Sequence, residues 1–420
     1  MKVARAVIEN FRHIKRLELD FTDSLGRVRD TTVLIGPNTS GKTTVLDALA
    51  VSIGIGTELI YRRPGFVLSP RTIVTRGSLQ TKVTCWVRFS PEEVATAKDL
   101  SRIRTGANTD DQPQDIRLYD LAKELKLANK IVLNDARGEG IEVSVPSNRI
   151  PRDVAERIRL KHTPGVEDVE LTWTYPDPNN KSTLGFTHYD PNGAWTLFKG
   201  RVTVARLLST GKIGWDSFRR AGGVFTFDQQ RAGMEKTIRR EIWDIIQGQS
   251  VGGDSEQRDR RTSDPKAILL SLAVQSLLPR GSGAKQLDQF KLVQERYAQV
   301  CAPHRLVGAV MDESGTPELV FNDGNYEYGY DGLSSGEQML LVFLIRMVSE
   351  HIHRSVVLVD EIELHQHPIW QRKLLNLLPK IGEENQIIAT THSPYLRDVL
   401  PPEAVIELGE ILEPATASAY

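Results

Sequence analysis

The sequence predicts an α/β fold built around a parallel sheet, and three observations carry this prediction. A short apolar strand, Thr31–Ile35, runs directly into a glycine-rich turn and then into a helix over Thr43–Ile53. Further along, a buried strand at Ser355–Val359 is followed by an amphipathic helix, Pro368–Leu378, which proline opens. A second buried strand follows at Gln386–Thr391. Strand, helix and strand at that spacing form a right-handed parallel unit.

The remaining elements divide the chain into three expected units. Alternating residues at Val3–Val7 and Leu17–Phe21, joined at Asn10–His13, predict half-buried strands, and another strand is expected at Thr81–Phe89. This N-terminal lobe, residues 1–90, carries the glycine-rich turn. Residues 91–222 are expected to be an insertion with a small core of its own, and residues 223–420 form a C-terminal lobe. Within the insertion, a helix is expected at Leu118–Leu127 and a turn at Tyr175–Asn180. In the C-terminal lobe, a strand at Gly223–Phe227 returns to the sheet and an exposed linker follows at Gln247–Pro265. A short helical arm at about 255–300 is made by Lys266–Leu278 and Gln286–Val300.

Composition limits the classes of function. The chain has 420 residues, with 53 Lys+Arg against 54 Asp+Glu and a formal net charge of -1. This balance excludes a protein that binds nucleic acid through overall basic charge, although a local basic face remains open. A content of 40% hydrophobic and 25% charged residues is typical of a globular protein.

The same sequence predicts a cytoplasmic protein that does not enter a membrane. Charged residues interrupt every apolar stretch before the roughly 18 residues that a spanning helix needs. The N-terminus shows no apolar signal segment. Only two cysteines occur, Cys85 and Cys301, so neither a disulfide framework nor a Cys-x-x-Cys metal site is expected.

The turn after Thr31–Ile35 fits the phosphate-loop pattern GxxxxGK[ST] at Gly36–Thr43. Glycines let the backbone wrap around phosphates, and the following helix directs its N–H groups at the anion. Lys42 would reach the β- and γ-phosphates of ATP and would be catalytic, and Thr43 would ligate Mg²⁺. A chance glycine turn is the alternative, and it should arise about once per hundred such chains. The expected nucleotide-binding residues here are Gly36, Pro37, Asn38, Thr39, Ser40, Gly41, Lys42, Thr43 and Thr44.

Two acids follow the buried strand Ser355–Val359. An open α/β sheet places ligand chemistry at the C-terminal ends of its strands. Asp360 is therefore expected in the Mg²⁺ shell, and Glu361 is expected to orient or deprotonate the attacking water. A solvated pair that caps a helix is the alternative for an isolated Asp-Glu.

Two more motifs complete a recognisable order. Leu333–Gln338 reads LSSGEQ before an apolar helix at Met339–Val348, and Thr390–Pro394 reads TTHSP. Phosphate loop, LSSGE, Asp-Glu and THSP in this order resemble the ABC-type ATPase heads of the SMC, RecF and OLD-like branch. The opening IENFRHIKRLELDF is similar to that branch as well, and Glu361–Pro368 resembles the DEPE…LHP stretch of the OLD-like group. The resemblance covers roughly residues 1–90 and 224–410. It implies an α/β phosphate-loop ATPase head with a mixed sheet plus an antiparallel β subdomain, an inserted α+β region and a short helical arm.

The resemblance implies a head-to-head homodimer, or a higher homo-oligomer, with ATP held between the phosphate loop of one subunit and the LSSGE helix of the other. The residues that it places on the partner's nucleotide are Ser334, Ser335, Gly336 and Glu337, and His392 would sense the γ-phosphate as a catalytic residue. Taken alone, LSSGE could be a helix N-cap and His392 a core histidine. Arg12 is a candidate phosphate contact and Gln80 a candidate metal-side glutamine. Ile362 departs from the family's proline after Asp-Glu.

Zinc and DNA are the other ligands that the sequence suggests. His365, His367 and His392 would need a fixed loop to bind zinc. One basic stretch, Lys199–Arg220, interleaves aromatic residues with cations and is a candidate site for double-stranded DNA. Its members are Lys199, Arg201, Arg206, Lys212, Arg219 and Arg220, with Trp215 and Phe218 between them, and a second group is Arg149, Arg152, Arg157, Arg159 and Lys161. Charge runs of this kind are usually solvated faces.

The expected function is that of a stand-alone ATPase. Residues 393–420 are too few for the Toprim nuclease that often follows this head in OLD-family proteins. The resemblance implies an ATP-gated sensor or scaffold for a separate effector, a nuclease or toxin, in antiphage defence. A RecF-like clamp on DNA in repair or recombination is the alternative, and a transporter subunit is disfavoured. Copurification would separate the first two, because a tightly bound partner favours the first and free dimers that shift DNA favour the second.

Overall fold

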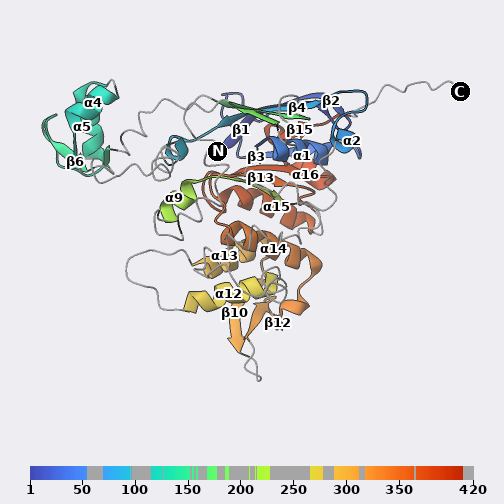
Figure 1. Ribbon diagram of the computed structural model, residues 1–420. Helices are drawn as coiled ribbons and strands as arrows, with labels where there is room; N and C mark the ends of the chain where they lie inside the picture. Colours follow the sequence, from blue (N-terminus) through green and yellow to red (C-terminus); the bar gives the residue numbers. More distant parts are fainter. Residues whose placement is uncertain are drawn as a thin grey trace, which may run out of the picture.

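The computed structural model describes most of the chain, and Figure 1 shows its arrangement in layers. The described residues are 1–53, 70–94, 96, 115–125, 127–151, 154, 155, 158, 168–176, 185–188, 208, 213, 215–227, 265–277, 288–311, 317–363 and 366–409. The expected linker at Gln247–Pro265 lies outside them except at its last residue.

An antiparallel sheet forms the top layer in Figure 1. Its order is β2-β1-β4-β7-β8. The strands are β1 (Lys2–Phe11), β2 (Ile14–Asp20), β4 (Thr81–Arg88), β7 (Val169–Tyr175) and β8 (Gly185–His188). The strands predicted at Val3–Val7, Leu17–Phe21 and Thr81–Phe89 are confirmed as β1, β2 and β4. One face of each is buried in the core.

The expected insertion, residues 91–222, divides in the structure. Strands β7 and β8 fall inside that range and yet extend the antiparallel sheet, with β7 paired along its whole length to β4. A separate small core joins α4 (Leu118–Glu124), α5 (Asn129–Gly138), β5 (Asp115–Arg117) and β6 (Arg149–Pro151). The independent core therefore belongs to about 116–158, whereas Val169–Tyr175 is part of the sheet.

A five-stranded parallel sheet forms the centre, in the order β15-β3-β14-β13-β9. Its strands are β3 (Thr31–Ile35), β9 (Val224–Phe227), β13 (Val356–Val359), β14 (Gln386–Thr390) and β15 (Val405–Glu407). All pairs among its described strands are parallel, so the predicted parallel unit is confirmed, and the mixed character expected of this sheet is not seen in those strands. Consequently the C-terminal ends of β3, β14 and β13, each of which carries a sequence motif, meet at one edge.

Helix α1 (Lys42–Ile53) lies between the two sheets. Every residue of α1 except Thr43 is buried, and most of them are apolar, as expected of a helix that is covered on more than one side. Near its C-terminal end the Ser52 hydroxyl lies 3.1 Å from the Cys85 sulfur on β4. Burial on both faces holds α1 firmly, so its first turn, at the phosphate loop, has a fixed position.

The other face of the parallel sheet packs on helices. Val357 and Val359 of β13 contact this second core, whereas Val356 and Leu358 contact the first, so the sheet is buried on both sides. The packed helices are α12 (Pro265–Leu277), α13 (Gln289–Cys301), α14 (Ser335–Ser349), α15 (Pro368–Leu377) and α16 (Pro394–Val399). Helices α12 and α13, expected as a short arm, share this core with α14.

A three-stranded antiparallel sheet beneath these helices was not predicted. It contains β10 (Arg305–Met311), β11 (Pro317–Asn322) and β12 (Glu327–Gly329). A register shift between Leu306 and Gly308 breaks the alternation of β10, which removed the sequence signal for a strand. The remaining short elements are α2 (Pro70–Ile73), α9 (Trp215–Arg220), and the 3₁₀ turns η3 (Tyr330–Gly332), η4 (Leu378–Lys380) and η5 (Pro402–Ala404).

Membrane insertion finds no support in the helices. Within the ranges given above, none is long and apolar enough to cross a bilayer.

Replacing Trp173 tests whether β7 belongs to the main core. The side chain is fully buried, stacks on Tyr175 at 5.8 Å and lies 6.3 Å from the ring of Phe11. Trp173→Ala should lower the free energy of unfolding by about 3–5 kcal/mol. Trp173→Phe is the matched control and should cost far less, because it keeps a ring and removes a buried N–H that has no hydrogen-bond partner among the described residues. Thermal unfolding of Trp173→Ala at the wild-type temperature would contradict this placement.

Candidate nucleotide-binding site

The phosphate loop connects β3 to α1 and closes on its own backbone. The Lys42 ammonium donates to the carbonyls of Gly36 at 2.8 Å and Pro37 at 2.9 Å. A Cβ atom at Gly36 would meet the Ser40 hydroxyl oxygen at 2.5 Å and the Leu408 carbonyl at 2.6 Å, so the loop requires glycine there. Gly41 has a φ of 85°, a left-handed conformation that glycine adopts without strain. The chain can therefore turn tightly enough to present its N–H groups to an anion.

Lys42 is a buried cation within a set of acids. Its side chain is nearly inaccessible, and burial lowers the pKa of its ammonium, whereas Glu363, Asp360 and Glu361 oppose that shift. A bound phosphate would add negative charge at this ammonium, which is the chemistry expected of a phosphate-loop lysine.

Thr43 and Asp360, both expected in the Mg²⁺ shell, are in contact. The Thr43 hydroxyl lies 3.1 Å from both carboxylate oxygens of Asp360, and Asp360 is only 2% exposed. A threonine hydroxyl beside a carboxylate provides the oxygen ligands that Mg²⁺ prefers. Because α1 and β13 are both fixed by burial, these two groups are held in place before any ligand binds.

Thr390 connects the acids and was missed by the sequence interpretation. Its hydroxyl donates to Asp360 Oδ1 at 2.7 Å and accepts from the Glu361 backbone N–H at 2.8 Å. One buried side chain at the end of β14 thus positions two acids at the end of β13. The sequence did carry a signal for Thr390, because it is the first residue of the TTHSP motif.

Glu361 sits on strained backbone beside His392. Its φ is 45°, which is uncommon for a residue with a side chain. Burial, with the neighbouring Asp360 charge, raises the pKa of the Glu361 carboxyl. Its Oε1 lies 3.9 Å from His392 Nε2. A carboxylate with a raised pKa is suited to accept a proton from water near neutral pH.

Glu363 is a third acid that the sequence interpretation did not single out. Its Oε1 accepts from the His392 backbone N–H at 2.5 Å, and its Oε2 is buried without a hydrogen-bond partner in the described structure. It therefore positions the turn that carries His392. The sequence signal for Glu363 was that it is the second glutamate of the DEPE-like stretch.

The LSSGE segment opens α14 as a capping box. Ser334 accepts from the Glu337 N–H at 3.3 Å, and the Glu337 carboxylate accepts from the Ser334 N–H at 2.9 Å and hydroxyl at 2.7 Å. Ser334 and Ser335 are exposed, whereas Gly336 and Glu337 are buried. The prediction that Glu337 contacts nucleotide is not supported, because its carboxylate points into the protein.

A chain of glutamines links this helix to the THSP turn. Gln366 Nε2 donates to the Gly336 carbonyl at 2.8 Å, and Gln371 Nε2 donates to the Gln366 carbonyl at 3.0 Å. The Ser393 hydroxyl then donates to Gln371 Oε1 at 2.7 Å. The segment after Asp360–Glu361 thus contacts two motifs that are far apart in the sequence.

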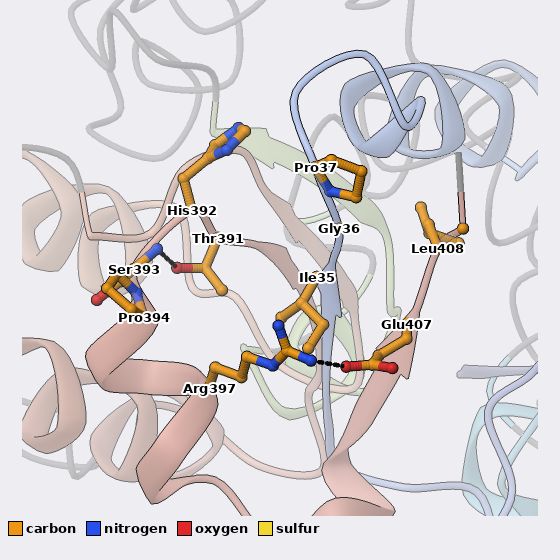
Figure 2. Close-up of a pocket in the computed structure, with 11 residues that line it drawn as sticks. Ile35, Gly36, Pro37, Thr391, His392, Ser393, Pro394, Arg397, Glu407 and Leu408 are labelled. Carbon is orange, nitrogen blue, oxygen red and sulfur yellow. Dashed lines mark hydrogen bonds and ion pairs between the residues drawn. The ribbon is translucent and has the colours of Figure 1, made fainter. Parts of the chain in front are cut away.

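A cavity of about 430 Å³ opens beside the phosphate loop. Figure 2 shows the end of β3 with Gly36 and Pro37, the turn with His392, and β15 around it. Arg397 and Glu407 close one side with an ion pair of 2.6 Å. His392 thus lies at an accessible edge of the site.

The roles expected of Arg12 and Gln80 in the site stay predictions. The Arg12 guanidinium forms an ion pair of 2.7 Å with Asp47 on α1, which accounts for its charge without a phosphate. Gln80 is exposed before β4, in the antiparallel sheet, and no hydrogen bond of the described residues joins it to Thr43 or Asp360. The parallel strand beside β13 is β9, where the Phe227 carbonyl accepts from the Asp360 N–H at 2.8 Å. The residues that follow Phe227 lie outside the described ones.

The expected DNA and zinc sites receive little support. Phe218 is fully buried on α9, edge-on to His351 at 6.2 Å, so it cannot stack on a base. Most of the two basic groups lies outside the described residues, as does His365; Arg149, Arg219 and Arg220 lie inside. Among the described side chains, no group of three or more His, Cys, Asp or Glu is placed to hold a metal ion.

Comparisons with known proteins agree with this geometry. Residues 1–53 match the family described as "AAA ATPase domain", and residues 251–398 match "AAA domain, putative AbiEii toxin, Type IV TA system". The retron Vc95 probable ATPase of Vibrio cholerae is 31% identical over 436 residues, covering 98% of this chain and 74% of that protein. This chain belongs to the same ATPase family. The predicted family is therefore confirmed.

Two further relatives match this chain over shorter segments. Septu protein PtuA of Bacillus thuringiensis is 31% identical over 110 residues, covering 23% of this chain and 28% of that protein. The retron Ec83 probable ATPase of Escherichia coli is 32% identical over 90 residues, covering 19% of this chain and 17% of that protein. Among solved structures, an Smc head bound to the C-terminal winged-helix domain of ScpA aligns with 97% of this chain at 12% identity and a TM-score of 0.46.

Removing the Thr390 hydroxyl should disable the candidate site while leaving the fold intact. Thr390→Val keeps the shape of the side chain but removes its bonds to Asp360 and Glu361. We expect ATP hydrolysis to fall about tenfold to one-hundredfold and the free energy of unfolding to fall by about 1–3 kcal/mol. Thr390→Ser, which restores a hydroxyl, should recover most of the activity in the same assay. Wild-type turnover by Thr390→Val would refute its positioning of the acids.

The raised pKa of Glu361 predicts a pH-dependent stability difference. Because the fold raises the pKa of the Glu361 carboxyl, the ionised form of this group destabilises the folded chain. The stability that the group contributes is therefore complete below the ordinary glutamate pKa. It is lost as pH rises through the higher pKa of the folded state. Glu361→Gln lacks this loss. Without nucleotide, the melting temperature of Glu361→Gln should therefore rise relative to wild type across that acidic range and then stay constant. A relative fall over the same range would contradict the direction of the shift.

Proposed function

We propose that this protein binds and hydrolyses ATP, and that ATP closes two copies head to head around composite sites. The observation that carries the proposal is the contact of Thr43 with Asp360 beside a phosphate loop whose lysine is buried among acids. Groups that would hold Mg²⁺ and the phosphates are thus assembled at the C-terminal edge of the parallel sheet, where such sheets bind ligands.

Each residue then has a defined chemical task. The loop N–H groups and Lys42 bind the β- and γ-phosphates, and the Thr43 hydroxyl and Asp360 carboxylate would hold Mg²⁺, which neutralises phosphate charge when bound. Glu361 takes the proton of the attacking water, a task that its raised pKa supports. His392, 3.9 Å from Glu361 and at the edge of the cavity, meets the γ-phosphate.

Exposure of the LSSGE helix supports its action on a second copy. Ser334 and Ser335 are exposed at the start of a helix of 15 residues, where a positive helix end attracts anions. No hydrogen bond of the described residues joins them to residues 36–44 of the same chain. A second copy related by a two-fold axis would receive this helix on its own phosphate loop, and the relation would be reciprocal.

The biological role that we propose is a sensor or scaffold for a separate effector in antiphage defence. The relatives named for retrons and for Septu support a role in defence, and the matching family description, which names a toxin, supports a paired effector. In such a protein the ATP-gated change between open and closed dimers would control the effector.

A mixing experiment tests the composite site. Lys42→Ala removes the cation of the phosphate loop, and Ser334→Arg places bulk where a hydroxyl should meet the γ-phosphate, so each variant alone should be inactive. In an equal mixture half of the dimers are heterodimers, and each has one intact interface. Hydrolysis should therefore recover to at most about a quarter of the wild-type rate.

The control is a mixture of Lys42→Ala with Glu361→Gln, two defects on the same side of the interface. This pair should stay inactive, because every interface in it keeps one defect. Equal recovery in both mixtures, or normal hydrolysis by Ser334→Arg as a monomer, would contradict the composite site.

A further inference from the structure

The buried acid of the LSSGE segment has more partners than a helix cap requires. Glu337 is only 3% exposed. Its Oε2 forms the cap with Ser334, while its Oε1 accepts from the Tyr297 hydroxyl at 2.6 Å and lies 2.8 Å from His304 Nδ1. Burial raises the pKa of Glu337, but these hydrogen bonds outweigh it and hold the pKa below the ordinary value. The acid is therefore an anion clamped on both oxygens.

The donors on Oε1 come from outside the motif. Tyr297 lies on α13 and is fully buried, and burial raises the pKa of its hydroxyl, which keeps it protonated as a donor. His304 follows α13, and its ring stands edge-on to Trp370 of α15 at 6.4 Å. Tyr328 of β12 lies 3.2 Å from His304 Nδ1 and 3.5 Å from Glu337 Oε1. Side chains from α13, from the connection that follows it and from β12 thus converge on one carboxylate oxygen.

The other oxygen controls the exposed end of the helix. Ser334 donates both its N–H and its hydroxyl to Glu337 Oε2, so the direction of that hydroxyl depends on where the carboxylate lies. A carboxylate held by Tyr297 and His304 cannot rotate to release Ser334 without leaving two donors of its own unpaired. Such a loss is costly for buried groups.

We propose that Tyr297 and His304 are positioning residues for the half of the composite site that this chain offers to its partner. They act through Glu337 on the geometry of Ser334, and they do not touch nucleotide. The small subdomain of α13 and β10–β12 thereby sets whether the LSSGE helix fits the partner's γ-phosphate. This inference rests on the proposed function and adds the residues that prepare the helix.

The proposal predicts which partner can repair a defect. Tyr297→Phe removes one hydroxyl without changing the ring, and it leaves this chain's own phosphate loop intact. The Kd for a fluorescent ATP analogue measured on separated chains should be unchanged, while hydrolysis should fall about tenfold to one-hundredfold. Tyr326→Phe is the matched control, since that tyrosine belongs to the same subdomain but is 76% exposed, and its hydrolysis should equal that of wild type.

Mixing Tyr297→Phe with each of the two inactive variants separates a positioning role of Tyr297 from general damage to the fold. With Lys42→Ala, the Tyr297→Phe chain should regain hydrolysis, because its sound phosphate loop meets a sound LSSGE helix. With Ser334→Arg it should regain none, because both helices are then defective. Equal rescue by the two partners, or a wild-type rate for Tyr297→Phe alone, would overturn the proposal.

His304 provides a second, independent arm. His304→Asn keeps an N–H donor near the position of Nδ1 and should retain most of the hydrolysis, whereas His304→Ala should lose it with the same partner-specific rescue. Equal activity of these two variants would overturn the role of His304. If Lys42→Ala and Ser334→Arg fail to rescue each other, the proposed composite site is contradicted as well. If they do rescue each other but Lys42→Ala does not selectively rescue Tyr297→Phe, only the role proposed for Tyr297 and His304 is contradicted.

Discussion

The contact between Thr43 and Asp360 is the constraint on which the rest of the site depends. The two residues are more than 300 positions apart, and they meet because α1 is buried between two sheets while β13 is buried on both faces. Each element is fixed by apolar packing, so the polar groups at their ends need no ligand to be brought together. Thr390 then adds the hydrogen bonds that aim both acids, and the phosphate loop follows from the position of β3 in the same sheet.

A second layer of polar contacts ties the phosphate side of the molecule to the LSSGE side. Gln366 donates to the Gly336 carbonyl, and Gln371 bonds both to Gln366 and to Ser393, the residue after His392. The first two of these bonds are buried and the third is partly buried, so breaking one would leave a polar group unpaired inside the protein. In the proposed dimer, these contacts would hold the phosphate loop and the LSSGE helix of one chain in a defined relation to each other.

Local patterns in the sequence were sufficient to predict the elements that carry motifs. The glycine-rich turn, the buried strands at Thr31–Ile35 and Val356–Val359 and the parallel unit follow from apolar runs and turn chemistry that neighbouring residues determine. The pairing of β7 with β4 depends on contacts across about 90 positions, so no local signal distinguished it from an insertion. The bulge in β10 erased the alternation of a true strand. The inward direction of Glu337 depends on Tyr297 and His304, which only the folded chain brings near.

The measurement that tests the account most directly is the solution mass of Glu361→Gln protein by light scattering, with and without ATP and Mg²⁺. This variant should bind ATP but not consume it, so the closed state should accumulate. The account predicts that the mass at least doubles with ATP and Mg²⁺ and returns to the starting value with ADP. Bound ATP with an unchanged monomer mass would contradict an ATP-gated composite site.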